Sequence, residues 1–141
     1  MKRKASAVWK GNLKEGQGSI SSESGTLKET QYSFSTRFEN GVGTNPEELI
    51  AAAHAGCFAM AFSSELGKAG LKPESIAATA TVTLEMLPAG PTVTESHLDV
   101  TAKVPGADGE KVLEIANAAK AGCPISRLLN AKVTMNAKVD G

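Results

Sequence analysis

Thr44–Phe62, with the sequence TNPEELIAAAHAGCFAMAF, is the most distinctive segment of the chain. It opens with residues that favour the start of a helix. Asn45 can cap free backbone N–H groups, and Pro46 at the first helical position gives up no needed donor. Glu47 and Glu48 then place negative charge at the positive end of the helix dipole. The segment therefore predicts a helix that begins at about Pro46.

The rest of this helix is apolar or small on every face. In the run Leu49–Phe62 the one strongly polar residue is His54, and the run also carries Cys57. A helix that is apolar all round is normally buried. We therefore expect a long buried central helix over about Pro46–Leu66, and a thiol on such a helix is the first place to look for chemistry.

Composition bounds the class of protein. The chain has 141 residues, with 15 basic and 15 acidic side chains and 41% hydrophobic residues. This length predicts one domain over residues 1–141. A net charge of zero is a poor match for nucleic acid, which attracts a basic surface. We expect no nucleic-acid partner.

No membrane or secretory segment is expected. The apolar run Leu49–Phe62 has 14 residues, fewer than the ~20 that a spanning helix needs. The basic N-terminus is not followed by the apolar core of a signal peptide. We therefore expect a cytoplasmic protein with reduced thiols and no membrane partner.

Alternating apolar residues predict strands on both sides of the central helix, and the helical pattern recurs only near the C-terminus. A second helix is expected over Asp108–Ala121, and a short one after Cys123, which would cap it ahead of Pro124. Strands and helices do not alternate regularly, which predicts an α+β fold with a largely antiparallel sheet. The expected strands are Lys4–Lys10, Gly16–Ser22, Gln31–Phe38, Ile76–Leu87, Thr92–Val104 and Lys132–Val139.

The central helix needs cover on all sides, and the early strands are thin in apolar residues. One chain of 141 residues falls short of that cover. We therefore expect a homodimer in which the two central helices are sandwiched.

Cys57 has an inert interpretation and a reactive one. An inert, buried small hydrophobe is the simpler interpretation, because free cysteines are often just that. A reactive thiol must ionise near neutral pH, whereas burial raises its pKa. Cys57 is expected in the middle of its helix, so a nearby cation would have to help. The candidates are His54, one turn earlier, and Arg37, on the polar face of the strand Gln31–Phe38; arginine is the better partner because it is always charged.

Cys123 is expected beside backbone N–H groups and the positive end of a helix dipole. It could be a plain turn residue before proline. Beside Cys57 it becomes a second thiol, one that could condense with a sulfenic acid to form a disulfide. Two cysteines without paired histidines are too few ligands for zinc. Glu47 and His54 each have simpler roles, as a first-turn acidic residue and as a core or interface residue.

These segments together resemble the OsmC/Ohr family, bacterial proteins of peroxide and osmotic stress. The resemblance covers nearly the whole chain. The helix motif and the Cys-Pro motif make it specific, because both occur in the right order and setting. It rests on SSESGTL at Ser21–Leu27, TRFE at Thr36–Glu39, TNPEELIAAAHAGCF at Thr44–Phe58 and KAGCPIS at Lys120–Ser126.

The resemblance implies a cysteine-based peroxidase that reduces organic hydroperoxides, and hydrogen peroxide more weakly, without metal, haem or other cofactor. It places the peroxidatic cysteine on Cys57, the resolving cysteine on Cys123, the activating arginine on Arg37 and its paired glutamate on Glu47. It also implies an intertwined α+β homodimer with its sites at the interface, and an external dithiol reductant of the lipoyl type.

Helix geometry adds a further expectation. Glu47 and Cys57 are ten positions apart, or roughly 15 Å along a straight helix. One arginine would be stretched to serve both in one chain. We therefore expect a composite site that takes Arg37 and Glu47 from one chain and Cys57 from the other. The alternative function is a redox-sensing or ligand-binding stress protein on the same fold, without turnover.

Overall fold

The computed structural model describes residues 1–140, which divide into two compact units. The first unit is Met1–Leu49 and the second begins at Ile50. The single domain expected over residues 1–141 stays a prediction.

The first unit is built on a small antiparallel sheet, sheet A. Its strands are β1 (Ala5–Lys10), β2 (Gln17–Ser22) and β3 (Thr30–Tyr32), in that order across the sheet. The Trp9 and Tyr32 rings meet over Gly18 with centroids 5.5 Å apart. A Cβ at Gly18 would lie within 2.4 Å of the Tyr32 ring, so only glycine fits beneath this aromatic pair.

Helix α1 (Phe34–Phe38) corrects the expected strand Gln31–Phe38. Only Gln31 and Tyr32 of that segment belong to a strand, β3. Ser33 caps α1 in a capping box: its hydroxyl accepts from the Thr36 N–H, and the Thr36 hydroxyl accepts from the Ser33 N–H. Two reciprocal bonds satisfy donors that a strand would leave to its neighbours, so local capping overrides the alternation of the aromatic residues. Arg37 therefore lies in the last turn of a helix and not on a strand face.

The first turn of helix α2 (Pro46–Lys68) is fixed in this unit as the sequence predicts. The Asn45 side chain accepts a hydrogen bond from the Glu48 N–H at 2.7 Å and donates one to the Thr36 carbonyl at 2.9 Å. The Thr44 hydroxyl donates to the Glu48 carboxylate at 2.9 Å. One asparagine thus caps α2 and attaches its start to α1.

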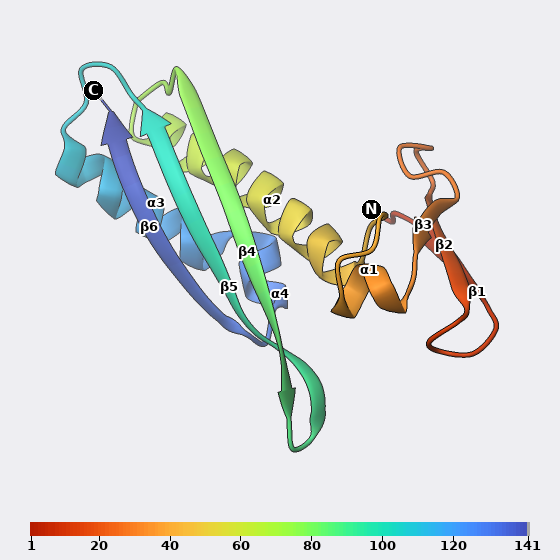
Figure 1. Cartoon of the computed structure of the whole chain (residues 1–141). Helices are drawn as coiled ribbons and strands as arrows, with labels where there is room; N and C mark the ends of the chain where they lie inside the picture. The colour runs from red at the N-terminus through yellow and green to blue at the C-terminus, as the bar shows by residue number, and fades with distance from the viewer. Residues whose placement is uncertain (141) are drawn as a thin grey trace. The chain divides into compact units, whose positions relative to one another are not determined.

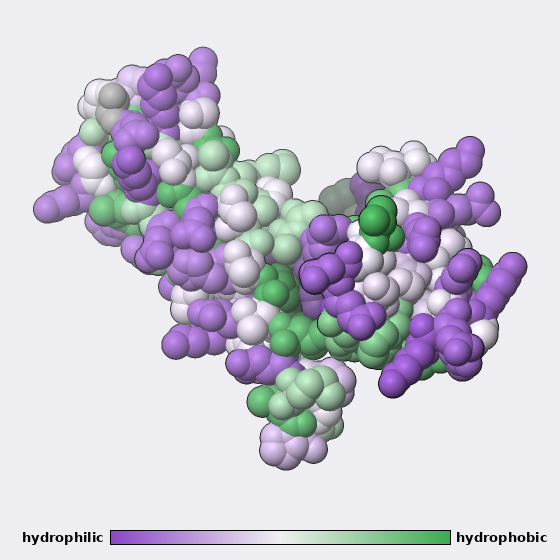
Figure 2. All heavy atoms as spheres, in the orientation of Figure 1, coloured by the Kyte–Doolittle hydropathy of each residue, from purple (hydrophilic) through white to green (hydrophobic). Residues whose placement is uncertain are grey.

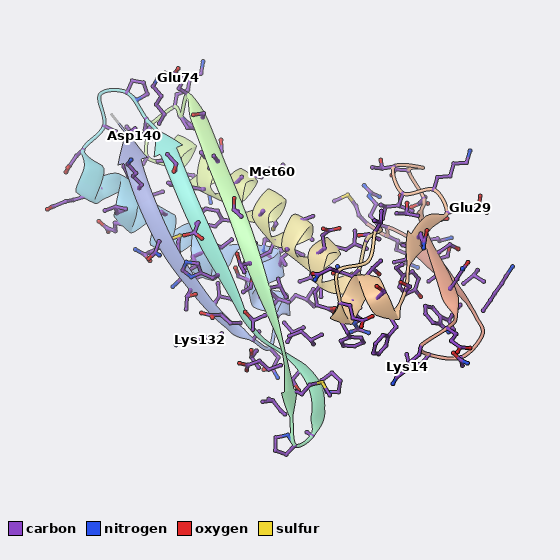
Figure 3. All side chains as sticks on the ribbon, viewed as in Figure 1. Lys14, Glu29, Met60, Glu74, Lys132 and Asp140 are labelled. Atoms are coloured by element: carbon purple, nitrogen blue, oxygen red, sulfur yellow. The ribbon has the colours of Figure 1, made fainter. Side chains whose placement is uncertain are left out.

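The second unit contains sheet B, in the order β4-β5-β6 (Figure 1). Strands β4 (Ser75–Leu87) and β5 (Gly90–Lys103) are antiparallel, whereas β6 (Lys132–Asp140) pairs parallel to β5. Figure 3 shows Glu74 and Asp140 at one end of this sheet, with Lys132 toward the other. With three antiparallel pairs and one parallel pair in the two sheets, the expected largely antiparallel architecture is confirmed.

Helices cover one face of sheet B (Figure 1). They are α2, α3 (Gly109–Gly122), which Asp108 caps through its side chain, and the short α4 (Pro124–Leu128), for which Cys123 occupies the N-cap position. The core between helices and sheet is one apolar cluster. Its buried members are Phe58, Phe62 and Leu66 of α2, Leu98, Val100, Ala102 and Val104 of the sheet side, Val112, Ile115, Ala116 and Ala119 of α3, and Cys123.

Within one chain, helix α2 is buried along one stripe only, so its burial on all sides, expected for the dimer, stays a prediction. Only 22% of its most apolar 18-residue window is buried within the chain, and Met60 is 78% exposed. Figure 2 shows weakly hydrophobic surface along part of this helix, and Figure 3 labels Met60 on it. Helix α2 is therefore apolar on more faces than a single chain buries.

The bounds of α2 lie close to the expected Pro46–Leu66. At 23 residues the whole helix is long and apolar enough to cross a membrane by length and composition, although the apolar run Leu49–Phe62 alone is too short to do so. Core helices of other proteins share these two properties, so they carry no argument for a membrane. The buried stripe of α2 includes the polar side chain of His54.

Candidate active site

The two cysteines lie in contact in the second unit. The Cys57 sulfur, on the middle turns of α2, is 3.0 Å from the Cys123 sulfur at the start of α4. Both are free thiols; Cys123 is fully buried and Cys57 is half-buried. Helix α3 delivers Cys123 to this position, because its last hydrogen bond joins the Cys123 N–H to the Ala119 carbonyl before Pro124 opens α4.

The surroundings shift the pKa values of the two thiols in opposite directions. Burial raises the pKa of Cys57, and the contact with Cys123 raises it further, although the Ile125 N–H opposes this. Burial also raises the pKa of Cys123, but the contact with Cys57, the N–H groups of Ser126 and Ile125 and the Ser126 hydroxyl outweigh it and lower the pKa below its ordinary value. Within one chain, the thiol that ionises more easily is thus Cys123, and no cation among the described residues of the second unit lowers the pKa of Cys57.

Arg37 and Glu47 form a two-pronged ion pair in the first unit. Arg37 Nε donates to Glu47 Oε1 at 2.9 Å, and Nη2 donates to Oε2 at 3.0 Å. The Glu47 side chain is 11% exposed and that of Arg37 is 39% exposed, so the carboxylate is enclosed while the guanidinium keeps an open side. The guanidinium also lies 5.4 Å from the centre of the Phe38 ring. Two parallel hydrogen bonds to one carboxylate fix the plane of the guanidinium group.

His54 is not placed as a cation beside Cys57. Its ring is completely buried, and burial lowers its pKa, so the imidazole is neutral at pH 7. Nδ1 lies 2.6 Å from Ser96 Oγ and Nε2 lies 2.8 Å from Ser126 Oγ. Of the two cations that the sequence offers for Cys57, only Arg37 is charged.

Two residues of this site were not foreseen as functional. Ser126 belongs to the Cys-Pro-Ile-Ser motif. This motif indicates a turn after Cys123 but gives no reason to single out the Ser126 hydroxyl. Ser96 stands on β5 with nothing in its sequence surroundings to mark it. Among residues 1–140, no group of three or more His, Cys, Asp or Glu side chains is arranged to hold a metal ion.

Two free thiols in contact, one of them at a helix start with a lowered pKa, define a dithiol site that can be oxidised to a disulfide and reduced again. Residues 38–138 match the family described as OsmC-like protein. The chain belongs to this family, as the sequence predicts.

Curated relatives and solved structures agree with this assignment. The chain is 48% identical over 134 residues to Peroxiredoxin OsmC of Escherichia coli (strain K12), covering 95% of this chain and 94% of the relative, and equally to Peroxiredoxin OsmC of Shigella flexneri. It is similar in fold to an OsmC-like protein from Mycoplasma pneumoniae, with a TM-score of 0.77 and 14% identity over 100% of this chain and 99% of the other. It is also similar to the organic hydroperoxide resistance protein OhrB of Bacillus subtilis, with a TM-score of 0.68 and 23% identity over 96% and 97% of the two chains.

Proposed function

We propose that this protein is a cysteine-based peroxidase that reduces organic hydroperoxides, and hydrogen peroxide more weakly, in defence against oxidative and osmotic stress. The observation that carries the proposal is the 3.0 Å contact between the sulfurs of Cys57 and Cys123. The name Peroxiredoxin OsmC on relatives with 48% identity supports the same activity.

Cys57 is the peroxidatic residue in this proposal. Cys57 is half-buried and so open in part to a substrate, whereas Cys123 is fully buried. The Cys57 thiolate attacks the distal oxygen of the hydroperoxide, the O–O bond breaks, and an alcohol leaves after taking up a proton. Cys57 becomes a sulfenic acid in this step.

Cys123 is the resolving residue. Its sulfur attacks the sulfenic sulfur of Cys57, a disulfide bond forms, and water leaves. Since the two sulfurs already touch, this step needs little rearrangement. An external dithiol, for which a lipoyl-type reductant is our proposal, then restores both thiols by exchange.

Arg37 supplies the cation that Cys57 lacks. A positive charge close to the sulfur favours its ionised form and opposes the rise in pKa that burial causes. Glu47 holds the guanidinium in one orientation through the two-pronged pair. The open side of Arg37 is free to face a thiolate and a peroxide oxygen.

The assay that tests the activity counts free thiols before and after one equivalent of cumene hydroperoxide. We expect both thiols of each chain to disappear together and to return on treatment with dihydrolipoamide. Steady-state rates for several hydroperoxides, with Cys57→Ser as blank, then rank the substrates. Thiols that survive the hydroperoxide would contradict the proposal.

The working unit in this proposal is an intertwined homodimer in the cytoplasm. Helix α2 exposes Ala53, Gly56 and Met60 along one side, and small and apolar residues in such a row allow two helices to approach closely. A second copy of α2 would cover what one chain leaves open.

The dimer also gives the site its composition. Glu47 and Cys57 are ten positions apart on α2, which corresponds to roughly 15 Å along the helix axis. We infer that Arg37 and Glu47 of one chain serve Cys57 of the other.

Mixed dimers test this composite site. We expect Cys57→Ala chains mixed with Arg37→Ala chains to regain peroxidase activity, because one of the two sites in each heterodimer receives an intact arginine and an intact cysteine. Each variant alone provides the blank. A mixture no more active than the sum of its parts, despite heterodimers seen by mass spectrometry, counts against a site shared between chains.

A further inference from the structure

His54 is a buried polar residue that the proposed chemistry leaves unused. It lies on α2 one turn before Cys57, and both it and Ser96 are completely buried. Burial of a polar ring is costly unless its nitrogens are hydrogen-bonded. Both are bonded here, to Ser96 Oγ of β5 at 2.6 Å and to Ser126 Oγ of α4 at 2.8 Å.

This arrangement joins the elements that carry the two cysteines. Among the described residues, the bond from His54 to Ser126 is the only hydrogen bond that joins a side chain of α2 to a side chain of α4. Helix α2 carries Cys57, and α4 begins directly after Cys123. The histidine therefore helps to hold Cys123 against Cys57.

Ser126 is the partner of His54 on α4. It lies in the first turn of that helix, three residues after the N-cap position that Cys123 occupies. Its hydroxyl and its backbone N–H both lower the pKa of the Cys123 thiol, so the partner of His54 belongs to the immediate surroundings of that thiol.

Both hydrogen bonds suit a neutral ring. A neutral imidazole has one donor and one acceptor nitrogen. With Nε2–H donating to Ser126 Oγ, Nδ1 accepts from the Ser96 hydroxyl; in the opposite tautomer Nδ1–H donates to Ser96 Oγ and Nε2 accepts from the Ser126 hydroxyl. Either tautomer joins α2 to β5 and to α4, so the link holds whichever nitrogen carries the hydrogen.

We propose that His54 and Ser126 are positioning residues for disulfide formation: the hydrogen bond between them fixes α4 against α2 so that Cys123 meets Cys57. This rests on the proposed function, in which Cys123 resolves the sulfenic acid of Cys57. The pair has no part in the attack on the peroxide.

The step that the pair assists is balanced without any further reactant. The Cys123 sulfur forms a bond to the Cys57 sulfur as the S–O bond of the sulfenic acid breaks. The departing hydroxide takes the proton that the Cys123 thiol gives up, and leaves as water. His54 and Ser126 give up no proton in this step, and their bond holds the elements that carry the two sulfurs.

The experiment separates sulfenic acid formation from disulfide formation. Ser126→Ala and wild-type protein are each given one equivalent of cumene hydroperoxide, then quenched over time with dimedone, which traps the sulfenic acid, and weighed by mass spectrometry. We expect the variant to consume peroxide at the wild-type rate but to form the disulfide roughly tenfold more slowly, as the loss of one hydrogen bond that leaves a buried ring nitrogen unpaired predicts. The dimedone adduct of Cys57 then accumulates.

Three further variants separate positioning from folding. Ser126→Thr restores a hydroxyl and is expected to recover fast disulfide formation. His54→Gln is expected to slow the same step as Ser126→Ala does. Ser75→Ala, an exposed serine at the start of β4, provides the matched control and changes neither step.

Two results would overturn the positioning role. One is disulfide formation at the wild-type rate in Ser126→Ala. The other is equal slowing of both steps together with a lower melting temperature, which a purely structural role predicts. Failure of the wild-type protein to consume peroxide is a different outcome, because it would remove the proposed function itself.

Discussion

Replacement of Cys57 by serine is expected to reduce peroxide consumption to the uncatalysed background. A serine hydroxyl does not ionise near neutral pH, so the variant lacks the nucleophile that breaks the O–O bond. Cys123 does not substitute for it despite its lowered pKa, because its sulfur is fully buried behind Cys57. The measurement is the loss of cumene hydroperoxide with excess dihydrolipoamide.

Cys123→Ser is the matched comparison for this variant. It keeps the peroxidatic thiol and the volume of the second side chain, and removes only the resolving sulfur. We expect one rapid oxidation of Cys57 per chain, followed by a sulfenic acid that dimedone traps. If instead Cys123→Ser abolishes the first oxidation while Cys57→Ser retains it, the roles of the two cysteines are reversed.

Arg37→Ala is expected to have the second largest effect, and the effect should depend on pH. Burial raises the pKa of the Cys57 thiol, and the contact with Cys123 adds to this rise. An opposite charge within about 4–6 Å typically lowers a pKa by about 1–3 units, so its loss should slow sulfenic acid formation at pH 7 about 10- to 1000-fold.

The sign of the pH effect distinguishes this role from a folding defect. Without the arginine, the Cys57 thiolate forms only at higher pH, so the rate of sulfenic acid formation should recover as pH rises. Arg37→Lys should form the sulfenic acid at a rate between those of the wild type and Arg37→Ala, since it keeps the charge but loses the two-pronged pair with Glu47. Arg3→Ala, at the exposed N-terminus, serves as the control. A loss of rate in Arg37→Ala that is the same at every pH would contradict the electrostatic role.

Local signals predicted most of the fold. Asn45 and Pro46 mark the start of α2, and Asp108 marks the start of α3, because caps and first-turn residues act within a few positions of the chain. The segment Gln31–Phe38 shows where such reasoning went wrong. Its aromatic residues alternate as in a strand, yet the capping box between Ser33 and Thr36 forms a helix. Two local patterns competed, and the one that satisfies more backbone donors prevailed.

The site was predictable only in part. The contact between the Glu47 and Arg37 side chains joins residues ten positions apart, and a family motif carries each of them. The partners of His54 are 42 and 72 positions away, on a strand and a helix whose placement depends on the whole core. No pattern in one sequence encodes such distances, so His54 could be recognised as buried but not as the link between the two cysteines.

The contact between the two sulfurs also bears on whether oxidation of this protein could act as a redox signal. A redox sensor must present a different surface to its partner after it has been oxidised. Here Cys57 and Cys123 already touch in the thiol form, and α3, α4 and α2 are held around them by core residues and by His54. A bond between atoms that are already neighbours leaves the outer surface almost unchanged. The arrangement therefore suits repeated reduction of an oxidant, and it suits a signal to a binding partner poorly.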